Sequence, residues 1–117
     1  MTDEVELTYR SEDTPGAVVI CLKGEIDCTH SNELTEWLKA TQESARKDVV
    51  IDLSEVDYID SSGLGALVGE RMRCLKQGRR FRLCSPKPVV QTVLQTSRLD
   101  HYFDVYPTRE AALAEGE

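Results

Sequence analysis

The chain has 117 residues, the length of one compact domain, and at this size a single core can bury well over half of the unfolded surface. Its formal charge of −7 disfavours nucleic acid and anionic membranes as partners. Aromatic residues make up only 6% of the chain, which is low for a surface that stacks on bases. We expect one domain over residues 1–117 that binds neither nucleic acid nor membrane.

The cysteines and the N-terminus bear on cofactors and location. The four cysteines show neither C-x-x-C spacing nor a paired Cys–His pattern, so they are expected to be reduced packing residues: Cys21, Cys28, Cys74 and Cys84. Residues 1–10 are acidic and lack the basic and apolar segments of a secretion signal, and no stretch is long enough to span a bilayer. We expect a cytoplasmic protein with no metal and no cofactor.

Two strands are predicted at the start of the chain. Val5, Leu7 and Tyr9 alternate with polar neighbours, which favours an edge strand. A cluster of turn formers at 12–16 precedes the continuous apolar run 17–22, which predicts a central strand.

A helix and a third strand follow. Apolar residues recur at helical spacing over 34–45, with Thr29 or Ser31 as the N-cap, and Trp37 is expected in the core. The β-branched run 49–53 comes after this crossover helix and should pair in parallel with an earlier strand.

Helical spacing returns over 64–75, in a helix that starts near Ser62 and is ended by Gly78 in a left-handed cap. Residues 80–83 alternate arginine with apolar side chains, which predicts a strand near a sheet edge with one buried and one wetter face.

The remainder predicts a short helix over 89–94, an extended piece at 105–106, a last helix capped by Thr108, and a frayed tail over 114–117. The order of elements predicts an α/β fold. We expect a mixed, mostly parallel sheet of about four to five strands packed by about four helices.

Residues 58–65 carry the strongest functional signal, because small, hydroxylated and flexible residues join a strand to a helix there. A hydroxyl at Ser62 would lie beside unpaired N–H groups and the positive end of the helix dipole, a position suited to a phosphate. Gly63 and Gly65 would let another protein approach closely. Alternatively, Ser61 or Ser62 is only an N-cap and the glycines permit tight packing; spacing alone leaves both interpretations open.

Three motifs together resemble the STAS-domain anti-sigma factor antagonists: Gly24-Glu25-Ile26-Asp27, Val50-Ile51-Asp52-Leu53 and Asp60-Ser61-Ser62-Gly63-Leu64-Gly65. The resemblance covers nearly the whole chain and implies a STAS-like fold. It implies that a partner serine kinase of the histidine-kinase-like ATPase fold, which is also the anti-sigma factor, phosphorylates Ser62. A PPM-type phosphatase would reverse the reaction. The unphosphorylated form would bind the kinase and release its client, and phosphate at Ser62 would block binding.

The resemblance also implies a partner-binding surface made of Asp27, Asp60, Ser61, Ser62, Gly63 and Leu64. For the two aspartates, local Asx-turn or capping chemistry is an equal alternative. The segment Cys28-Thr29-His30 departs from the small or apolar residues expected after the first motif, which leaves the contacts of that loop open. We expect a monomer that forms heterocomplexes.

Two other functions compete with this interpretation. A hydrolase elbow, G-x-S-x-G, needs glycine two residues to either side of the serine, and neither Ser61 nor Ser62 has it. No pattern places His30 or His101 beside Ser62, so we expect no enzyme activity. The second alternative is a STAS scaffold subunit of a stress-sensing or lipid-transport complex, which would bind its partner without a phosphorylation cycle.

Overall fold

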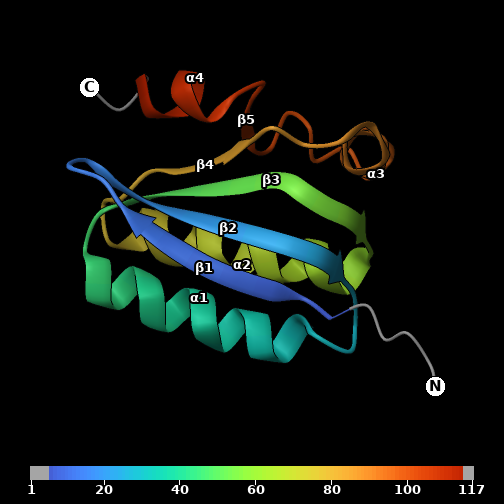
Figure 1. Cartoon of the computed structure of the whole chain (residues 1–117), viewed down its shortest axis with the longest axis horizontal. Coiled ribbons are helices and arrows are strands. Elements are labelled where there is room, and N and C mark those ends of the chain that lie inside the picture. The colour runs from blue at the N-terminus through green and yellow to red at the C-terminus, as the bar shows by residue number, and fades with distance from the viewer. Residues whose placement is uncertain (1–5, 115–117) are drawn as a thin grey trace.

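The computed structural model describes residues 6–114 as a five-stranded mixed sheet with helices on both faces (Figure 1). This architecture confirms the predicted α/β class. The strands are β1 (Thr8–Asp13), β2 (Ala17–Ile26), β3 (Asp48–Ile59), β4 (Phe81–Cys84) and β5 (Asp104–Tyr106). The helices are α1 (Ser31–Ala45), α2 (Ser61–Lys76), α3 (Pro88–Thr96) and α4 (Arg109–Ala114). Val5 and the end of the predicted frayed tail lie outside the described residues.

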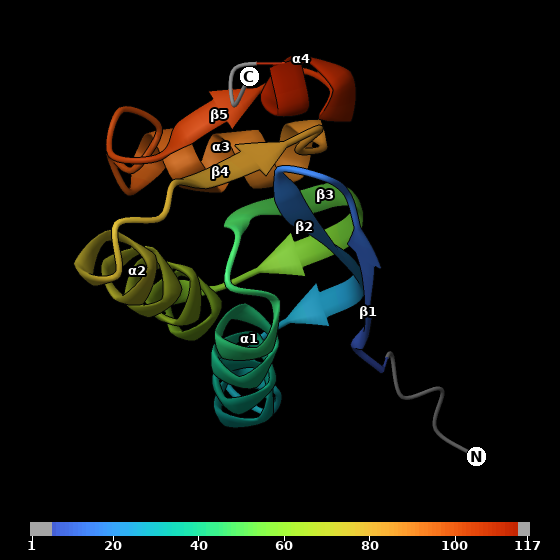
Figure 2. The same cartoon turned by 90° about the vertical axis from the view of Figure 1, so that its left-hand side faces the viewer.

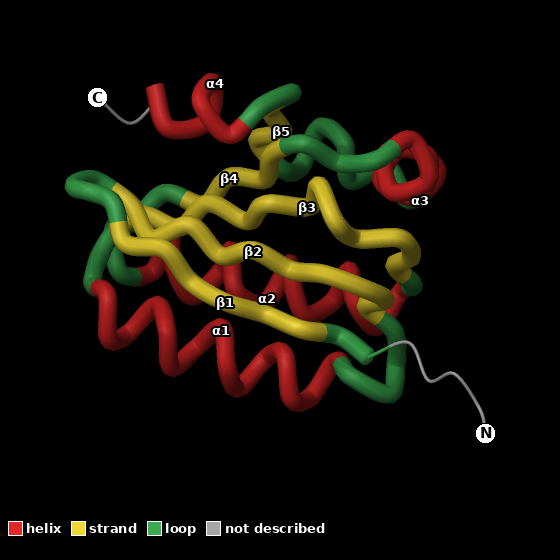
Figure 3. The backbone as a smooth tube through the Cα atoms, in the orientation of Figure 1, coloured by secondary structure: helices red, strands yellow, loops and turns green. Residues whose placement is uncertain are grey.

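The strands lie side by side in the order in which they occur in the chain. β1 pairs with β2 antiparallel, whereas each later pair is parallel and is joined through a helix. The pairing of β2 with β3 ends at Ile26 and Ile59. The loops that follow these two central strands therefore leave the same edge of the sheet (Figure 3).

The two faces of the sheet cover different cores, because successive side chains of a strand point to opposite sides. Ile20 and Leu22 of β2 belong to the main core, which also takes in the buried side chains of α1 and α2. Val19 and Cys21 belong to a smaller cluster that includes Ala112 of α4. Figure 2 shows α1 and α2 on one side of the sheet and α4 on the other.

The start of α1 differs from the sequence prediction. The N-cap is His30, whose side chain makes no capping hydrogen bond, and the helix begins at Ser31. Neither of the predicted caps holds this position: Ser31 is already the first helical residue, and Thr29 lies in the preceding loop, where its backbone N–H donates to the Asp27 carboxylate at 3.0 Å. Trp37 is half-buried at the margin of the main core, where its ring meets Tyr9 edge-on with centroids 4.5 Å apart.

The ends of two other helices agree with the sequence. Gly78 has a φ of +72° and donates to the carbonyl of Leu75, which ends α2 as predicted. The hydroxyl of Thr108 accepts the N–H of Ala111 at 3.1 Å and caps α4. Among residues 6–114, the helices all lack the combination of length and apolarity that a membrane span requires.

The predicted wetter face of β4 is wrong. Arg82 is 1% exposed, and its guanidinium lies 3.6 Å from the carboxylate of Asp48. The three-residue strand β5 adds a further strand outside β4, and α4 contacts β4 from the side opposite the main core. Both faces of β4 are therefore covered.

Candidate functional site

The residue that caps α2 is Asp60, not one of the two serines. Asp60 has extended backbone geometry, and its Oδ1 accepts the N–H of Gly63 at 3.0 Å. The alternative in which Ser61 or Ser62 serves as the N-cap is therefore wrong. Ser61 is exposed and Ser62 is half-buried, and within residues 6–114 neither hydroxyl has a hydrogen-bond partner. Both hydroxyls are free for other chemistry.

The second oxygen of Asp60 reaches the neighbouring loop. Asp60 Oδ2 accepts the backbone N–H of Cys28 at 3.2 Å, and the Asp60 N–H donates to the carbonyl of Ile26 at 3.1 Å. These bonds fasten the β2–α1 loop to the start of α2. Cys28 thus joins the site through its backbone, a role that no side-chain pattern in the sequence signals.

Asp27 orders the same β2–α1 loop from within. Its Oδ1 accepts the N–H of Thr29 and lies 2.9 Å from Nδ1 of His30. Asp27 therefore makes the Asx turn, and Asp60 the cap, that the sequence left as alternatives to partner contact. A carboxylate can order a loop and still face a partner, so the partner-binding role of both aspartates stays a prediction.

The two glycines near the serines differ in how much space a side chain would find at each position. A Cβ added at Gly63 would lie 2.5 Å from the carbonyl oxygen of Ile26 and 2.9 Å from a side-chain carbon of Ile59, so α2 approaches the sheet through this position. A Cβ at Gly65 would meet nothing within 4 Å. Leu64 is 5% exposed and packs in the main core, so its contribution to any partner contact is indirect.

The described residues offer no metal site and little thiol reactivity. Within residues 6–114, no group of three or more His, Cys, Asp or Glu side chains is arranged to hold a metal ion. Burial raises the pKa of Cys21 and Cys84 to about 11 and that of Cys74 to about 12, so these thiols stay protonated. Cys28 is exposed, which makes the predicted packing role wrong for this one cysteine.

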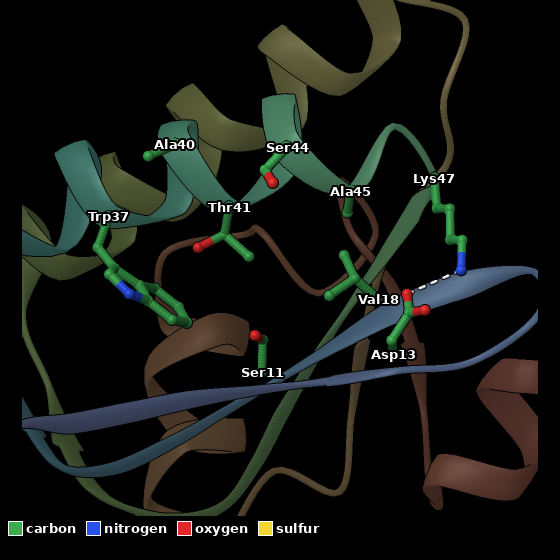
Figure 4. Close-up of a pocket in the computed structure, with 9 residues that line it drawn as sticks. All are labelled: Ser11, Asp13, Val18, Trp37, Ala40, Thr41, Ser44, Ala45 and Lys47. Carbon is green, nitrogen blue, oxygen red and sulfur yellow. Dashed lines mark hydrogen bonds and ion pairs between the residues drawn. The ribbon is translucent and has the colours of Figure 1, made fainter.

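A separate hollow of about 570 Å³ lies between β1 and α1 (Figure 4). The indole of Trp37 stands at one end, and the ion pair of Lys47 with Asp13, 2.7 Å long, stands at the other. Its lining includes none of the residues that the sequence assigned to partner binding or phosphorylation. The hollow is therefore distinct from the surface around Ser62.

Comparison with known proteins gives a consistent result. The family model of the STAS domain matches residues 8–112. BtrV of Bordetella bronchiseptica, named as a candidate anti-sigma factor antagonist, is 36% identical over 101 residues, 85% of each chain. The anti-sigma F factor antagonist of Paenibacillus polymyxa is 27% identical over 97% of each chain. The crystal structure of an anti-sigma factor antagonist from Mycobacterium paratuberculosis has a TM-score of 0.86 at 29% identity, covering 95% of this chain and 94% of that one.

The family model over residues 8–112 and the 36% identity to BtrV show that the chain belongs to the STAS domain family.

Proposed function

We propose that the chain is an anti-sigma factor antagonist in which Ser62 is a reversible phosphorylation switch. The main support for this proposal is that two different residues at the start of α2 serve as the helix cap and as the free hydroxyl. Asp60 supplies the cap, and the Ser62 hydroxyl, second in the helix, has no hydrogen-bond partner among the described residues. A helix N-terminus accommodates an added anion. Phosphorylation at Ser62 would therefore leave the cap and the fold in place.

The proposed partner is a serine kinase of the histidine-kinase-like ATPase fold that is also the anti-sigma factor. The names of the relatives support an anti-sigma factor as the partner. The unphosphorylated form would dock on this kinase and free its client, and a PPM-type phosphatase would regenerate that form. The docking surface would be built from Asp27, Asp60, Ser61 and Ser62, shaped from beneath by Gly63 and Leu64.

Phosphate would weaken docking through charge. At pH 7 a phosphoserine carries about −1.5 to −2 charges. Ser62 is two residues from Asp60, and the loop of Asp27 is fastened to Asp60 through Cys28. The modification would thus turn a surface of free hydroxyls and two structural carboxylates into a strongly anionic one. We expect docking at the Ser62 surface to be lost by repulsion, without a change of backbone.

We also propose that the chain is a regulator without catalytic activity, that it acts in the cytoplasm, and that it is monomeric before it meets its partner. His30 is engaged by Asp27, and His101 is exposed beside Asp100. In the described part of the chain, neither imidazole hydrogen-bonds to Ser61 or Ser62. This arrangement supports a serine that is modified by another enzyme over a serine that attacks a substrate.

The test is mass spectrometry of the intact protein and its peptides after purification from its own cells, with and without serine phosphatase treatment. Phosphate on Ser62 that the phosphatase removes is the expected result. Ser62→Ala should abolish the modified species, and Ser61→Ala, the matched control, should retain it. If Ser62 stays unmodified under several growth conditions, the switch is wrong and a scaffold role without phosphorylation replaces it.

A further inference from the structure

The outer side of α2 is sparsely charged: of the exposed residues of this helix, Lys76 at its end is the charged one. Between positions 61 and 75, the exposed residues are all uncharged: Ser61, Gly65, Met72 and Leu75. The exposed side of α1, in contrast, carries Glu33, Glu36, Lys39 and Glu43. Met72 is 50% exposed and Leu75 is 51% exposed, more than any other large apolar side chain in residues 6–114. Exposed apolar side chains that gather on one helix face are typical of an interaction surface.

Cations flank these two side chains. Arg71 precedes Leu75 by one turn, and Lys76 follows Met72 by one turn, so each cation lies beside an apolar neighbour. The guanidinium of Arg71 lies 4.2 Å from the ring centroid of Tyr102, which fixes its position without neutralising its charge. Arg73 differs, because its charge is paired with the buried Glu70 at 2.9 Å.

The wider charge pattern reinforces this local one. Residues 71–99 contain eight of the fourteen lysines and arginines and none of the twenty-one aspartates and glutamates. Of these eight cations, Arg82 is buried beside Asp48, and Arg73 and Lys87 are paired with Glu70 and Asp57. The cations of α2 that have no carboxylate partner among residues 6–114 are Arg71 and Lys76. Such a surface attracts an acidic partner even though the whole molecule repels it at long range.

The second half of α2 is well separated from Ser62. At 1.5 Å per residue, Met72 lies about 15 Å and Leu75 about 20 Å along the helix from Ser62. The Debye length at physiological ionic strength is about 8 Å. A phosphate on Ser62 would therefore have little direct effect on a contact made at Met72 and Leu75.

We propose that Met72 and Leu75, flanked by Arg71 and Lys76, form a second contact site for the partner protein, here called the α2 outer patch. The half-buried Val68 lies one turn before Met72 and borders this patch. The proposal rests on the partner-binding function above. Its occupant is an amphipathic helix with an apolar face and an acidic border, because that pattern complements an apolar stripe between two cations. Gly65 is exposed and Gly69 is half-buried, and neither position carries a side chain that would keep a second helix from approaching α2 there.

The two contact sites would have separate duties. Docking at Ser62 responds to phosphorylation, whereas the α2 outer patch binds in either state. The phosphorylated protein would then keep a weak hold on its partner.

The test uses two synthetic 18-residue helices and needs no kinase. One peptide carries leucines at i, i+3, i+4 and i+7 spacing bordered by glutamates, and the other replaces every glutamate by lysine. Each is titrated into the ¹⁵N-labelled full chain and followed by amide chemical shifts. The glutamate peptide should bind at least about tenfold more tightly, with shifts centred on Val68, Met72 and Leu75. Net charge alone would favour the lysine peptide, so this preference reports the patch itself.

Variants complete the design. The double variant Arg71→Glu with Lys76→Glu should weaken binding of the glutamate peptide at least about tenfold. The double variant Met72→Ser with Leu75→Ser should weaken it to the same extent. Lys39→Glu on the exposed side of α1 is the matched control and should bind like the wild type. Ser62→Asp should also bind like the wild type. Any of three results would overturn the proposal: the lysine peptide binds as tightly as the glutamate peptide or more tightly, the shifts centre elsewhere, or the Arg71/Lys76 variant binds fully. Each of these results is independent of whether Ser62 is phosphorylated in cells.

Discussion

At the scale of single residues, one carboxylate holds two loops in place. Asp60 satisfies the N–H of Gly63 with one oxygen and the N–H of Cys28 with the other. Ser61 and Ser62 therefore do not serve as the cap of α2. A side chain that is free of structural bonds can be modified without loss of stability, and this property is consistent with the modification proposed for Ser62.

Substitution of Asp60 and of Ser62 should have different effects on stability, because only Asp60 caps α2. Asp60→Ala should lower the free energy of unfolding by about 1–2 kcal/mol, because α2 loses its N-cap and the adjoining loop loses its anchor. Ser62→Ala should change it by less than about 0.5 kcal/mol. Urea denaturation followed by circular dichroism measures both. A larger loss for Ser62→Ala than for Asp60→Ala would show that the serine carries the cap.

The two glycines of the same segment should respond in opposite directions. Gly63→Ala should destabilise the fold by about 1–3 kcal/mol, because its Cβ would lie 2.5 Å from a backbone oxygen that has little room to move. Gly65→Ala meets open space and should stabilise α2 by up to about 1 kcal/mol through helix propensity. Thermal unfolding of both variants checks this, and a neutral Gly63→Ala would contradict the packing described for Ile26.

At the scale of elements, α4 is a six-residue helix held to the sheet by Arg109. The Arg109 guanidinium lies 2.8 Å from the carboxylate of Glu12 on β1 and 3.0 Å from that of Asp52 on β3. Burial alone raises the pKa of Asp52, but hydrogen bonds from Ser54 and Arg109 outweigh it, and the net pKa is lowered. The pair thus joins the last helix to both an edge strand and a central strand.

Removal of this anchor should have a pH-dependent cost. Arg109→Ala should destabilise the protein by about 1–3 kcal/mol at neutral pH, less than for a fully buried pair because the Arg109 side chain is 31% exposed. A lowered pKa means that the contribution of Asp52 is present above its ordinary value of 3.8 and is lost as the pH falls through the folded value. Wild type and variant should therefore converge in acid. Chemical denaturation from pH 7 to pH 3 measures the difference, and a constant gap would argue against the pairing.

Elements with a regular pattern were predictable from the sequence, and irregular ones were not. Helix α2, its end at Gly78 and the cap at Thr108 follow from local chemistry. The second half of β3 was missed because β3 carries one extra residue against β2 after Asp52 and another after Val56, and these break the alternation of its own side chains. The burial of Arg82 depends on segments that lie far away in the sequence: Asp48 of β3, the neighbouring strand β5, and α4, which packs against β4.

The same division holds for the site. The position of the serine pair was predictable from its place between a strand and a helix. The identity of the cap was not, because Asp60, Ser61 and Ser62 are three adjacent capping residues and their order of preference is nearly equal. The fit of Gly63 against Ile26 settles the choice by fixing where the helix begins.

At the scale of the whole molecule, a buried acid couples stability to pH. Glu70 on α2 is fully buried, and burial raises its pKa above the ordinary value of 4.5 although Arg73 opposes the shift. A raised pKa means that the folded chain holds this proton more tightly than the unfolded chain. Its contribution to stability is thus present below pH 4.5 and is lost as the pH rises through the folded value.

Glu70→Gln should therefore flatten the dependence of unfolding free energy on pH above pH 4.5. The slope removed is at most about 1.36 kcal/mol per pH unit, the value for one proton. Glu36→Gln, on the exposed side of α1, controls for the loss of one acid. Denaturation curves between pH 4 and pH 8 make the comparison, and an unaltered slope in Glu70→Gln would place the pH dependence elsewhere.

The match between strand order and chain order bears on how the protein is made. Each strand pairs with the strand synthesised just before it, so a chain leaving the ribosome need not wait for a distant segment before it extends the sheet. One edge of the growing sheet stays at β1, and the other is the newest strand, which the following helix and strand soon cover. The surface around Ser62 is complete once α2 has emerged, before β4 and β5 exist. A nascent chain would thus hold the proposed docking surface while β4 and β5 are still being translated.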